Sequence, residues 1–219
     1  RATAVAFTPD GNTLAVADSP GGAPGQVHLW KVGDEKPFAS WTAHNDSILD
    51  LKISANGKTL ATGSADKLAR VWNLATQKEV AKLEGHTSYV QAVAFGKDDA
   101  ELATGGADKE IKVWDIAGQE KKSAFSGRSA GVTALHWTPG GQTLLAVGED
   151  GSAASITDIK RHNGEQSSSP GTERKLSSVG EVLYAVTATT DGKTVFGGGH
   201  DGSVYMWEAG KTAVKLDAK

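Results

Sequence analysis

Residues 85–116, GHTSYVQAVAFGKDDAELATGGADKEIKVWDI, repeat the pattern of residues 43–74, AHNDSILDLKISANGKTLATGSADKLARVWNL. In both stretches an aspartate lies 22 residues after a histidine, a threonine precedes that aspartate by four residues, and a tryptophan follows it by six. Four residues matched at equal spacing indicate one structural unit present twice. The matched residues are His44, Thr62, Asp66 and Trp72 in one stretch and His86, Thr104, Asp108 and Trp114 in the other.

Tryptophans and turn sequences extend the repeat beyond these two stretches. Trp30, Trp72 and Trp114 are spaced by 42 residues, and each ends an apolar, strand-like run. The glycines in the recurring turns accept the positive φ of a tight hairpin. One hairpin recurring along the chain predicts a repeated all-β architecture. The turns are Pro9-Asp10-Gly11-Asn12, Asn56-Gly57-Lys58, Pro139-Gly140-Gly141-Gln142 and Asp191-Gly192-Lys193.

The pair formed by Gly85-His86 and Val113-Trp114-Asp115-Ile116 resembles the signature of the WD-repeat family of β-propellers. Ala43-His44 with Val71-Trp72-Asn73-Leu74 is a near copy. The resemblance implies one propeller domain or segment over 1–219, built of four-stranded antiparallel sheets called blades. Because rings of this family usually contain about seven or eight blades, we expect part of a larger ring, with a closed five-blade ring as the alternative. The five expected blades are 1–42, 43–84, 85–126, 127–177 and 178–219.

Alternating apolar residues place the strands most clearly in the third blade. Val90, Val93 and Phe95 mark its first strand, and further strands are expected at 102–105, 111–116 and 122–125. Insertions at 19–25 and 160–172 lack apolar periodicity, so we expect both to be solvated loops.

Histidine, aspartate and a hydroxyl are also the ingredients of a nucleophilic triad. The family resemblance implies a structural use instead, in which Trp72 donates its indole N–H to Thr62, Thr62 bonds His44, and His44 bonds Asp66. We favour this reading, and the same roles carry over to the second set of four residues. Such a buried network stabilises a blade only if every polar group in it has a partner.

The last two blades depart from the pattern. Blade four has arginine in place of the histidine, and its third strand, residues 155–159, contains no tryptophan, so it has no indole to begin the network. Blade five retains its turn aspartate and tryptophan. We expect blade four to be the least stable. The residues at the first three positions of blade four are Arg128, Ala146 and Asp150, and those at the four positions of blade five are Val179, Gly197, Asp201 and Trp207.

Composition excludes several classes of function. A formal net charge of -3 with a sequence pI near 6.1 does not provide the clustered basic residues of a nucleic-acid surface. Cysteine is absent, so the chain has no disulfide framework and no thiolate site, and its compartment stays open between cytoplasm and periplasm. No apolar run approaches the roughly 18 residues of a membrane-spanning helix, and residues 1–3 begin a strand pattern rather than a signal peptide.

Motifs for cofactors and metals are treated as chance matches. Residues 197–202 fit G-x-G-x-x-G, but a strand pattern follows where a phosphate-binding loop needs a helix. His28 and His136 lie on predicted strands without neighbours at metal-ligand spacing. We therefore expect no cofactor and no metal.

The loops of the top propeller face are the expected binding surface. In the family, the residues three and five positions after the repeat histidine usually open onto this face. Tyrosine combines a large apolar area with a polar tip, so Tyr89 and Tyr184 are the leading candidates for partner contacts. Arg128 could bind a partner carboxylate, and Glu149 and His200 replace small residues of the cleaner blades. The projected positions are Ser47 and Leu49, Tyr89 and Gln91, Gly131 and Thr133, and Val182 and Tyr184.

The sequence thus predicts a non-catalytic scaffold that binds a peptide or protein surface. The alternative is a propeller enzyme or an enzyme-associated domain, for which Glu149 and His200 are the only suitable side chains among the projected positions. A third reading is an array that only supports assembly of a larger complex through a blade side. Further blades or domains of the same native chain would be compatible with each reading.

Overall fold

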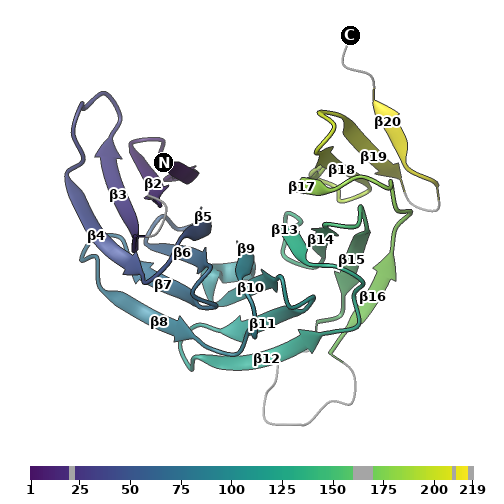
Figure 1. The fold of residues 1–219 in the computed structure, drawn as a ribbon, viewed down its shortest axis with the longest axis horizontal. Helices are drawn as coiled ribbons and strands as arrows, with labels where there is room; N and C mark the ends of the chain where they lie inside the picture. Colours follow the sequence, from purple (N-terminus) through teal and green to yellow (C-terminus); the bar gives the residue numbers. More distant parts are fainter. Residues whose placement is uncertain (20–22, 160–169, 209–210, 217–219) are drawn as a thin grey trace. The chain divides into compact units, whose positions relative to one another are not determined.

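The computed structural model describes residues 1–19, 23–159, 170–208 and 211–216. Its strands form five four-stranded antiparallel sheets, as predicted (Figure 1). In each sheet the strands are neighbours in chain order, so each blade is a simple up-and-down meander. Parts of both predicted insertions, residues 20–22 and 160–169, lie outside the described residues. No helix in the described part of the chain is long and apolar enough to span a membrane.

The first two blades contain eight strands. β4 continues through Ala43 and His44, past the expected end of blade one at residue 42. Blade one comprises β1 (Ala2–Phe7), β2 (Thr13–Asp18), β3 (Gly25–Lys31) and β4 (Ala39–His44). Blade two comprises β5 (Ile48–Ile53), β6 (Thr59–Ser64), β7 (Ala69–Asn73) and β8 (Glu79–Leu83).

The remaining blades follow the same order. Blade three comprises β9 (Val90–Phe95), β10 (Glu101–Gly106), β11 (Ile111–Asp115) and β12 (Glu120–Phe125). Blade four comprises β13 (Val132–Trp137), β14 (Leu144–Gly148), β15 (Ala153–Thr157) and β16 (Thr172–Lys175). Blade five comprises β17 (Leu183–Ala188), β18 (Thr194–Gly199), β19 (Val204–Glu208) and β20 (Val214–Leu216).

A hydroxyl at the end of the first strand closes the recurring hairpin. In blade two, Ser54 Oγ accepts a hydrogen bond from the backbone N of Thr59 at 3.0 Å and donates to Asn56 Oδ1 at 2.9 Å. Gly57 completes this turn with a φ of 70°. Thr189 bonds Thr194 and Asp191 in the same way in blade five. Local side-chain bonds of this kind favour turns over continued strand.

The chain divides into two compact units, one of residues 1–104 and 114–120 and the other of residues 105–113 and 121–219. In the first, two apolar clusters lie between successive blades: one includes Leu29, Ile48 and Leu60, and the other includes Val71 and Val90. In the second, the cluster joins strands of blades four and five. Each blade therefore buries its apolar surface against a neighbour, as repeat architectures require.

Glycine permits close approach between adjacent blades. A Cβ atom at Gly63 in β6 would lie 2.9 Å from the carbonyl oxygen of Val90 in β9. At Gly105, the matching position of blade three, a Cβ atom would lie 2.5 Å from a methyl group of Val132 in β13. Each of these glycines follows the threonine of a matched set. A larger side chain at either position would displace the first strand of the following blade.

Two aspartates link blade two to blade three through backbone groups. Asp50 Oδ2 accepts a hydrogen bond from the backbone N of Val93 at 2.9 Å. The carboxylate of Asp99 accepts from the backbone N of both Ala55 and Asn56, each at 2.8 Å. Asp99 has a φ of 55°, a conformation that aspartate tolerates better than most residues. These bonds fix how the two sheets stack.

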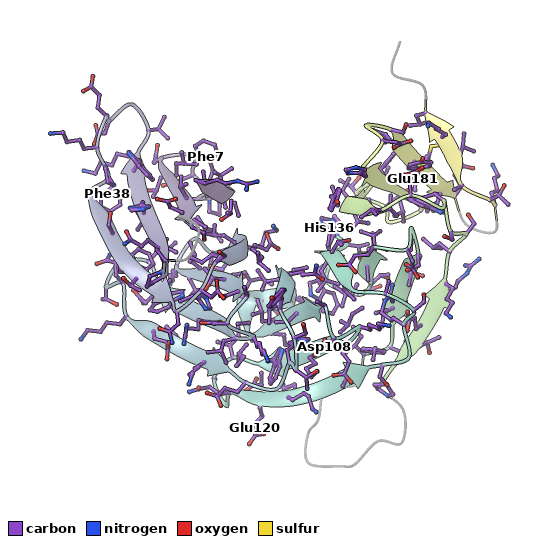
Figure 2. The ribbon with its side chains drawn as sticks, in the orientation of Figure 1. Phe7, Phe38, Asp108, Glu120, His136 and Glu181 are labelled. Carbon is purple, nitrogen blue, oxygen red and sulfur yellow. The ribbon has the colours of Figure 1, made fainter. Side chains whose placement is uncertain are left out.

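Blade one carries an exposed apolar surface. Phe7, labelled in Figure 2, is 58% exposed. Phe7 borders a groove of about 300 Å³ that Leu14, Val16 and Trp30 also line. Large apolar side chains collected on one face indicate a surface that binds another element.

Candidate functional site

The four residues of the first matched set form one continuous hydrogen-bonded chain, which joins His44 at the end of β4 to blade two. Trp72 Nε1 donates to Thr62 Oγ1 at 3.2 Å, and Thr62 Oγ1 lies 2.7 Å from His44 Nε2. His44 Nδ1 lies 3.0 Å from both carboxylate oxygens of Asp66. Because a carboxylate only accepts, Nδ1 carries the proton and Nε2 accepts from the Thr62 hydroxyl.

An arginine that the sequence analysis missed completes this network. Arg70 Nη1 donates to the carbonyl of Ala43 at 2.8 Å and to Asp66 Oδ2 at 3.2 Å, and its Nε lies 3.0 Å from Glu79 Oε2. The Arg70 side chain is 11% exposed. One guanidinium thus bridges two carboxylates across β7 and β8.

Burial and hydrogen bonding determine the charge states of His44 and Asp66 in this network. Burial lowers the pKa of His44 despite the neighbouring carboxylate, so the imidazole is neutral at physiological pH. Burial by itself would raise the pKa of Asp66, but the hydrogen bond from His44 and two backbone N–H groups lower it to about 2. An imidazole that only positions a carboxylate, with a buried threonine at its other nitrogen, is suited to structure rather than to nucleophilic catalysis.

Blade three brings together the equivalent residues. Thr104 Oγ1 lies 2.8 Å from His86 Nε2 and accepts the indole N–H of Trp114, also at 2.8 Å. Asp108 lies 3.6 Å from the buried ammonium group of Lys112, which also pairs with Glu110. Lys112 therefore occupies the place that Arg70 has in blade two.

The residue four positions after the turn aspartate supplies this extra partner. Arg70 follows Asp66 by four residues, Lys112 follows Asp108 by four, and Tyr205 follows Asp201 by four. In blade five, Tyr205 Oη donates to Asp201 Oδ2 at 3.0 Å, and Lys215 Nζ approaches the same oxygen at 2.8 Å. The Asp-x-x-x-donor spacing in the sequence could therefore have identified Arg70, Lys112 and Tyr205 as partners of the turn aspartates.

In blade five, the indole N–H of the tryptophan has a different hydrogen-bond partner. Gly197 occupies the threonine position, so the Trp207 indole donates instead to the backbone carbonyl of Ser177 at 2.8 Å. The hydroxyl of Ser177 accepts from the backbone N of Ala213 at 2.6 Å. A loop residue before the blade thus connects β19 with the segment that begins β20.

Arg128 lies inside blade four rather than free at the surface. Its side chain is 6% exposed, and Nη1 lies 2.5 Å from Glu173 Oε1 in β16. Its Nη2 lies 3.5 Å from Ser152 Oγ. The guanidinium therefore already binds a carboxylate of its own blade. Asp150 in turn accepts from Ser129 Oγ and from the backbone N of Ser152.

The remaining candidates of the second unit lie on blades four and five. Tyr184 in β17 is 57% exposed, and its ring packs edge-on against His200 with the centroids 5.9 Å apart. The backbone N of His200 bonds the carbonyl of Val182 at 2.8 Å, which holds the two residues beside each other. Glu149 also bonds through its backbone N, to the carbonyl of Gly131 at 3.1 Å.

In the first unit, three candidates lie on or next to first strands. Tyr89 directly precedes β9 and is 50% exposed. Leu49 in β5 and Gln91 in β9 are half-buried. Tyr89 therefore offers the larger accessible apolar area among these three.

No group of three or more histidine or carboxylate residues in the described ranges is arranged to hold a metal ion. His28 lies instead with Nδ1 2.8 Å from Ser40 Oγ in the adjacent strand, and its Nε2 is 3.7 Å from Asp18. This ring has cross-strand partners within blade one.

Comparison with known families gave one match. The family model described as WD domain, G-beta repeat, matches residues 35–73, 77–115, 119–154 and 175–208, which together exceed half of the chain. A comparison with curated proteins found no match.

Proposed function

Since the chain belongs to the WD40 family of G-beta repeats, whose domains generally bind proteins, we propose that it is a non-catalytic scaffold that binds a peptide or protein surface through its top-face loops. One observation carries this proposal: Tyr89 and Tyr184 are 50% and 57% exposed, although tyrosine contributes a large apolar area when it is buried. Tyrosines of this kind commonly supply a large part of the affinity of a protein interface.

The hydrogen-bonded networks support the non-catalytic reading. In the first matched set the polar groups of His44, Thr62 and Asp66 already have partners within the chain. The hydroxyl of Thr62 is fully buried, so it has no access to a substrate. These histidine, threonine and aspartate residues therefore stabilise the fold and are not available for catalysis.

A pull-down with Tyr89→Ala and Tyr184→Ala tests the proposal, and each variant should lose most of the partner captured by the unmodified protein. Truncating an interface tyrosine costs about 2 kcal/mol, or roughly thirtyfold in affinity. Phe38→Ala is the matched control, because Phe38 is an aromatic residue of similar exposure outside the top-face set. Equal partner recovery by all three variants would contradict docking through the tyrosines and favour assembly through a blade side.

The alternative function is an enzyme that uses Glu149 and His200. His200 is exposed and in ring contact with Tyr184, so it is accessible to a substrate. Turnover that disappears in Glu149→Gln or His200→Gln, with unchanged thermal unfolding, would establish that alternative.

We further propose that an additional blade of the native chain covers the groove beside Phe7. Its lining by Leu14, Val16 and Trp30 is similar in character to the surfaces that blades bury against one another. Determining the mass and sequence of the intact native protein tests this, because a chain without further repeats would contradict it.

A further inference from the structure

In blade four, the arginine that pairs with the outer strand comes from a different position than in blade two. Glu79 in β8 and Glu173 in β16 are equivalent residues by sheet register. The cation beside Glu79 is Arg70 of the third strand, which also bonds the turn aspartate of blade two. The cation beside Glu173 is Arg128, and the residue equivalent to Arg70 is Ala154. Blade four therefore has a small side chain where blade two has a long one.

Ala154 lines a cavity of about 360 Å³ in blade four. The buried residues Ala153 and Ala154 form part of its apolar wall. Ser129 and Lys175, which also line it, are exposed, so the cavity is open to the surface. An apolar wall combined with a few polar groups is typical of a ligand site.

Arg128 contributes an unused hydrogen-bond donor to this cavity. Its side chain is 6% exposed, Nη1 lies 2.5 Å from Glu173 Oε1, and Nη2 lies 3.5 Å from Ser152 Oγ. Its Nε is buried and has no hydrogen-bond partner among the described residues. Buried polar atoms normally have a partner, and a guanidinium only donates. The complementary group beside Arg128 is therefore an acceptor, such as a carbonyl oxygen.

Asp150 contributes an acceptor to the same lining. It accepts hydrogen bonds from Ser129 Oγ and from the backbone N and the hydroxyl of Ser152. Since a carboxylate has about four lone-pair sites, it can accept a further bond. Burial by itself would raise the pKa of Asp150, but the hydrogen bonds from Ser129 and Ser152 lower it, so the carboxylate is ionised at physiological pH. The complementary group beside Asp150 is a donor.

The charges of the lining balance one another. Arg128 and Lys175 are the cations of the lining, and Asp150 and Glu173 are its carboxylates. A charged ligand of either sign would therefore lie close to a like charge, which is costly. A neutral group that accepts a hydrogen bond at one atom and donates one at another fits this lining better. A primary carboxamide has both a carbonyl acceptor and an N–H donor.

We propose that this cavity binds the side-chain carboxamide of an asparagine or glutamine from a protein or peptide partner. Its oxygen accepts from Nε of Arg128, its N–H donates to Asp150, and its aliphatic part packs against Ala154. The neutral imidazole of His44 shows the same chemistry, because it donates to a turn aspartate at one nitrogen and accepts at the other. The inference rests on the proposed function for the source of the group, but its test needs no partner.

The first experiment titrates the unmodified protein with three probes of similar size and different charge: propionamide, propionate and propylammonium. The readout is the Nε–H resonance of Arg128 in a ¹⁵N-edited NMR spectrum, identified by its absence from Arg128→Lys. Propionamide should shift this resonance saturably, and the two charged probes should bind at least about tenfold more weakly, because each meets a like charge in the lining. Equal binding of the three probes, or no shift with propionamide, would overturn the proposal.

A fourth probe, N-methylacetamide, distinguishes a side-chain carboxamide from a backbone peptide group. Like a trans peptide, it has its carbonyl and its N–H on opposite sides. It should bind more weakly than propionamide. Equal or stronger binding of N-methylacetamide would assign the cavity to a backbone group and would overturn the side-chain assignment. Neither of these comparisons depends on whether a substituted protein folds.

Variants then locate the site. Ala154→Leu should block propionamide by filling the cavity, and Asp150→Asn should weaken it because a charge-assisted hydrogen bond becomes a neutral one. Asp191→Asn, which changes an exposed aspartate of another turn in the same unit, is the matched control and should bind normally. Normal binding by folded Ala154→Leu or Asp150→Asn would contradict the assignment.

Lys175→Met tests whether the exposed lysine, rather than Arg128, receives the carbonyl. This variant should bind propionamide as the unmodified protein does, and loss of binding would overturn the role of Arg128. Partner capture by the Tyr89 and Tyr184 variants is a separate measurement. Absence of propionamide binding with tyrosine-dependent capture would contradict this inference alone, and the opposite pair of results would contradict only docking through the tyrosines.

Discussion

Gly197 in β18 lies directly against the indole of Trp207 in β19: a Cβ atom at position 197 would be 2.9 Å from the Cζ3 atom of the ring. The threonine found here in blades two and three would collide with the tryptophan that it bonds in those blades. Blade five has instead moved the indole N–H to the carbonyl of Ser177. Trp207 therefore occupies the same position in the repeat as the other tryptophans, but its indole bonds a backbone carbonyl instead of a threonine hydroxyl.

Restoring the repeat residue should destabilise blade five. We expect Gly197→Thr to lower the free energy of unfolding by about 1–3 kcal/mol, because it overpacks a buried contact. Urea unfolding followed by tryptophan fluorescence measures the change. Gly198→Ala is the matched control on the same strand, since a Cβ atom there would meet only an ordinary contact at 3.5 Å. Equal effects of the two variants would show that the close approach to Trp207 is not the cause.

The network of blade two should behave as a coupled unit. Thr62→Val leaves the indole N–H of Trp72 and the Nε2 of His44 without their shared partner, which should cost about 1–3 kcal/mol. In a double-mutant cycle with Trp72→Phe, the combined loss should be smaller than the sum of the single losses by about 0.5 kcal/mol or more. Thr42→Val, on the exposed side of β4, should have little effect. Additive losses would indicate that the two side chains stabilise the blade independently.

The pKa of Asp66 predicts acid sensitivity. Its value of about 2 is below the ordinary 3.8, so ionised Asp66 contributes its full stabilisation above about pH 4 and loses it as the pH falls toward 2. This contribution is about 2 kcal/mol. The pKa of His44 is also lowered, so stability should begin to fall below the ordinary value of 6.5.

Unfolding by urea at pH 7, 5, 4 and 3 measures this dependence. Asp66→Asn should remove the part of the loss that occurs below pH 4, whereas the exposed variant Asp34→Asn should follow the unmodified protein. An Asp66→Asn variant with the same slope between pH 4 and pH 3 as the unmodified protein would rule out Asp66 as its source.

The contact of Asp99 with blade two can be separated from its backbone conformation. Asp98 and Asp99 both have positive φ, but Asp99 accepts the two backbone hydrogen bonds from Ala55 and Asn56. Asparagine also tolerates this conformation. Asp99→Asn should therefore cost about 1 kcal/mol through weaker acceptance, and Asp98→Asn should be nearly neutral. Thermal unfolding compares the two, and equal shifts would argue against the contact.

The sequence was sufficient for the fold where the repeat is regular. The 42-residue spacing of tryptophans located the third strands, and the apolar alternation of Val90, Val93 and Phe95 located β9. The matched intervals also identified the residues that meet in blade two, because equal spacing along equal strands brings the same positions together. Fold and register are properties of the repeat, so a periodic sequence reveals them.

The irregular blades could not be worked out in the same way. Arg128 bonds Glu173, 45 residues later, and Trp207 bonds the backbone of Ser177, 30 residues earlier. Neither contact occurs in a regular blade, so no interval predicted it. A carbonyl partner such as Ser177 leaves no side-chain signal at all. Arg70 was missed for another reason: only comparison of the residues four positions after each turn aspartate shows its role.

The approach of Gly63 to Val90, and of Gly105 to Val132, has a consequence for engineering with these repeats. In both pairs, a glycine of one blade packs against a valine of the next blade. The interface is therefore formed by two consecutive repeats rather than by one. A chimaera that exchanges a single complete blade would separate the two halves of that fit. A segment that ends after the first strand of the following blade would keep each glycine together with its valine. Such a segment is therefore a better unit to exchange than a single complete blade.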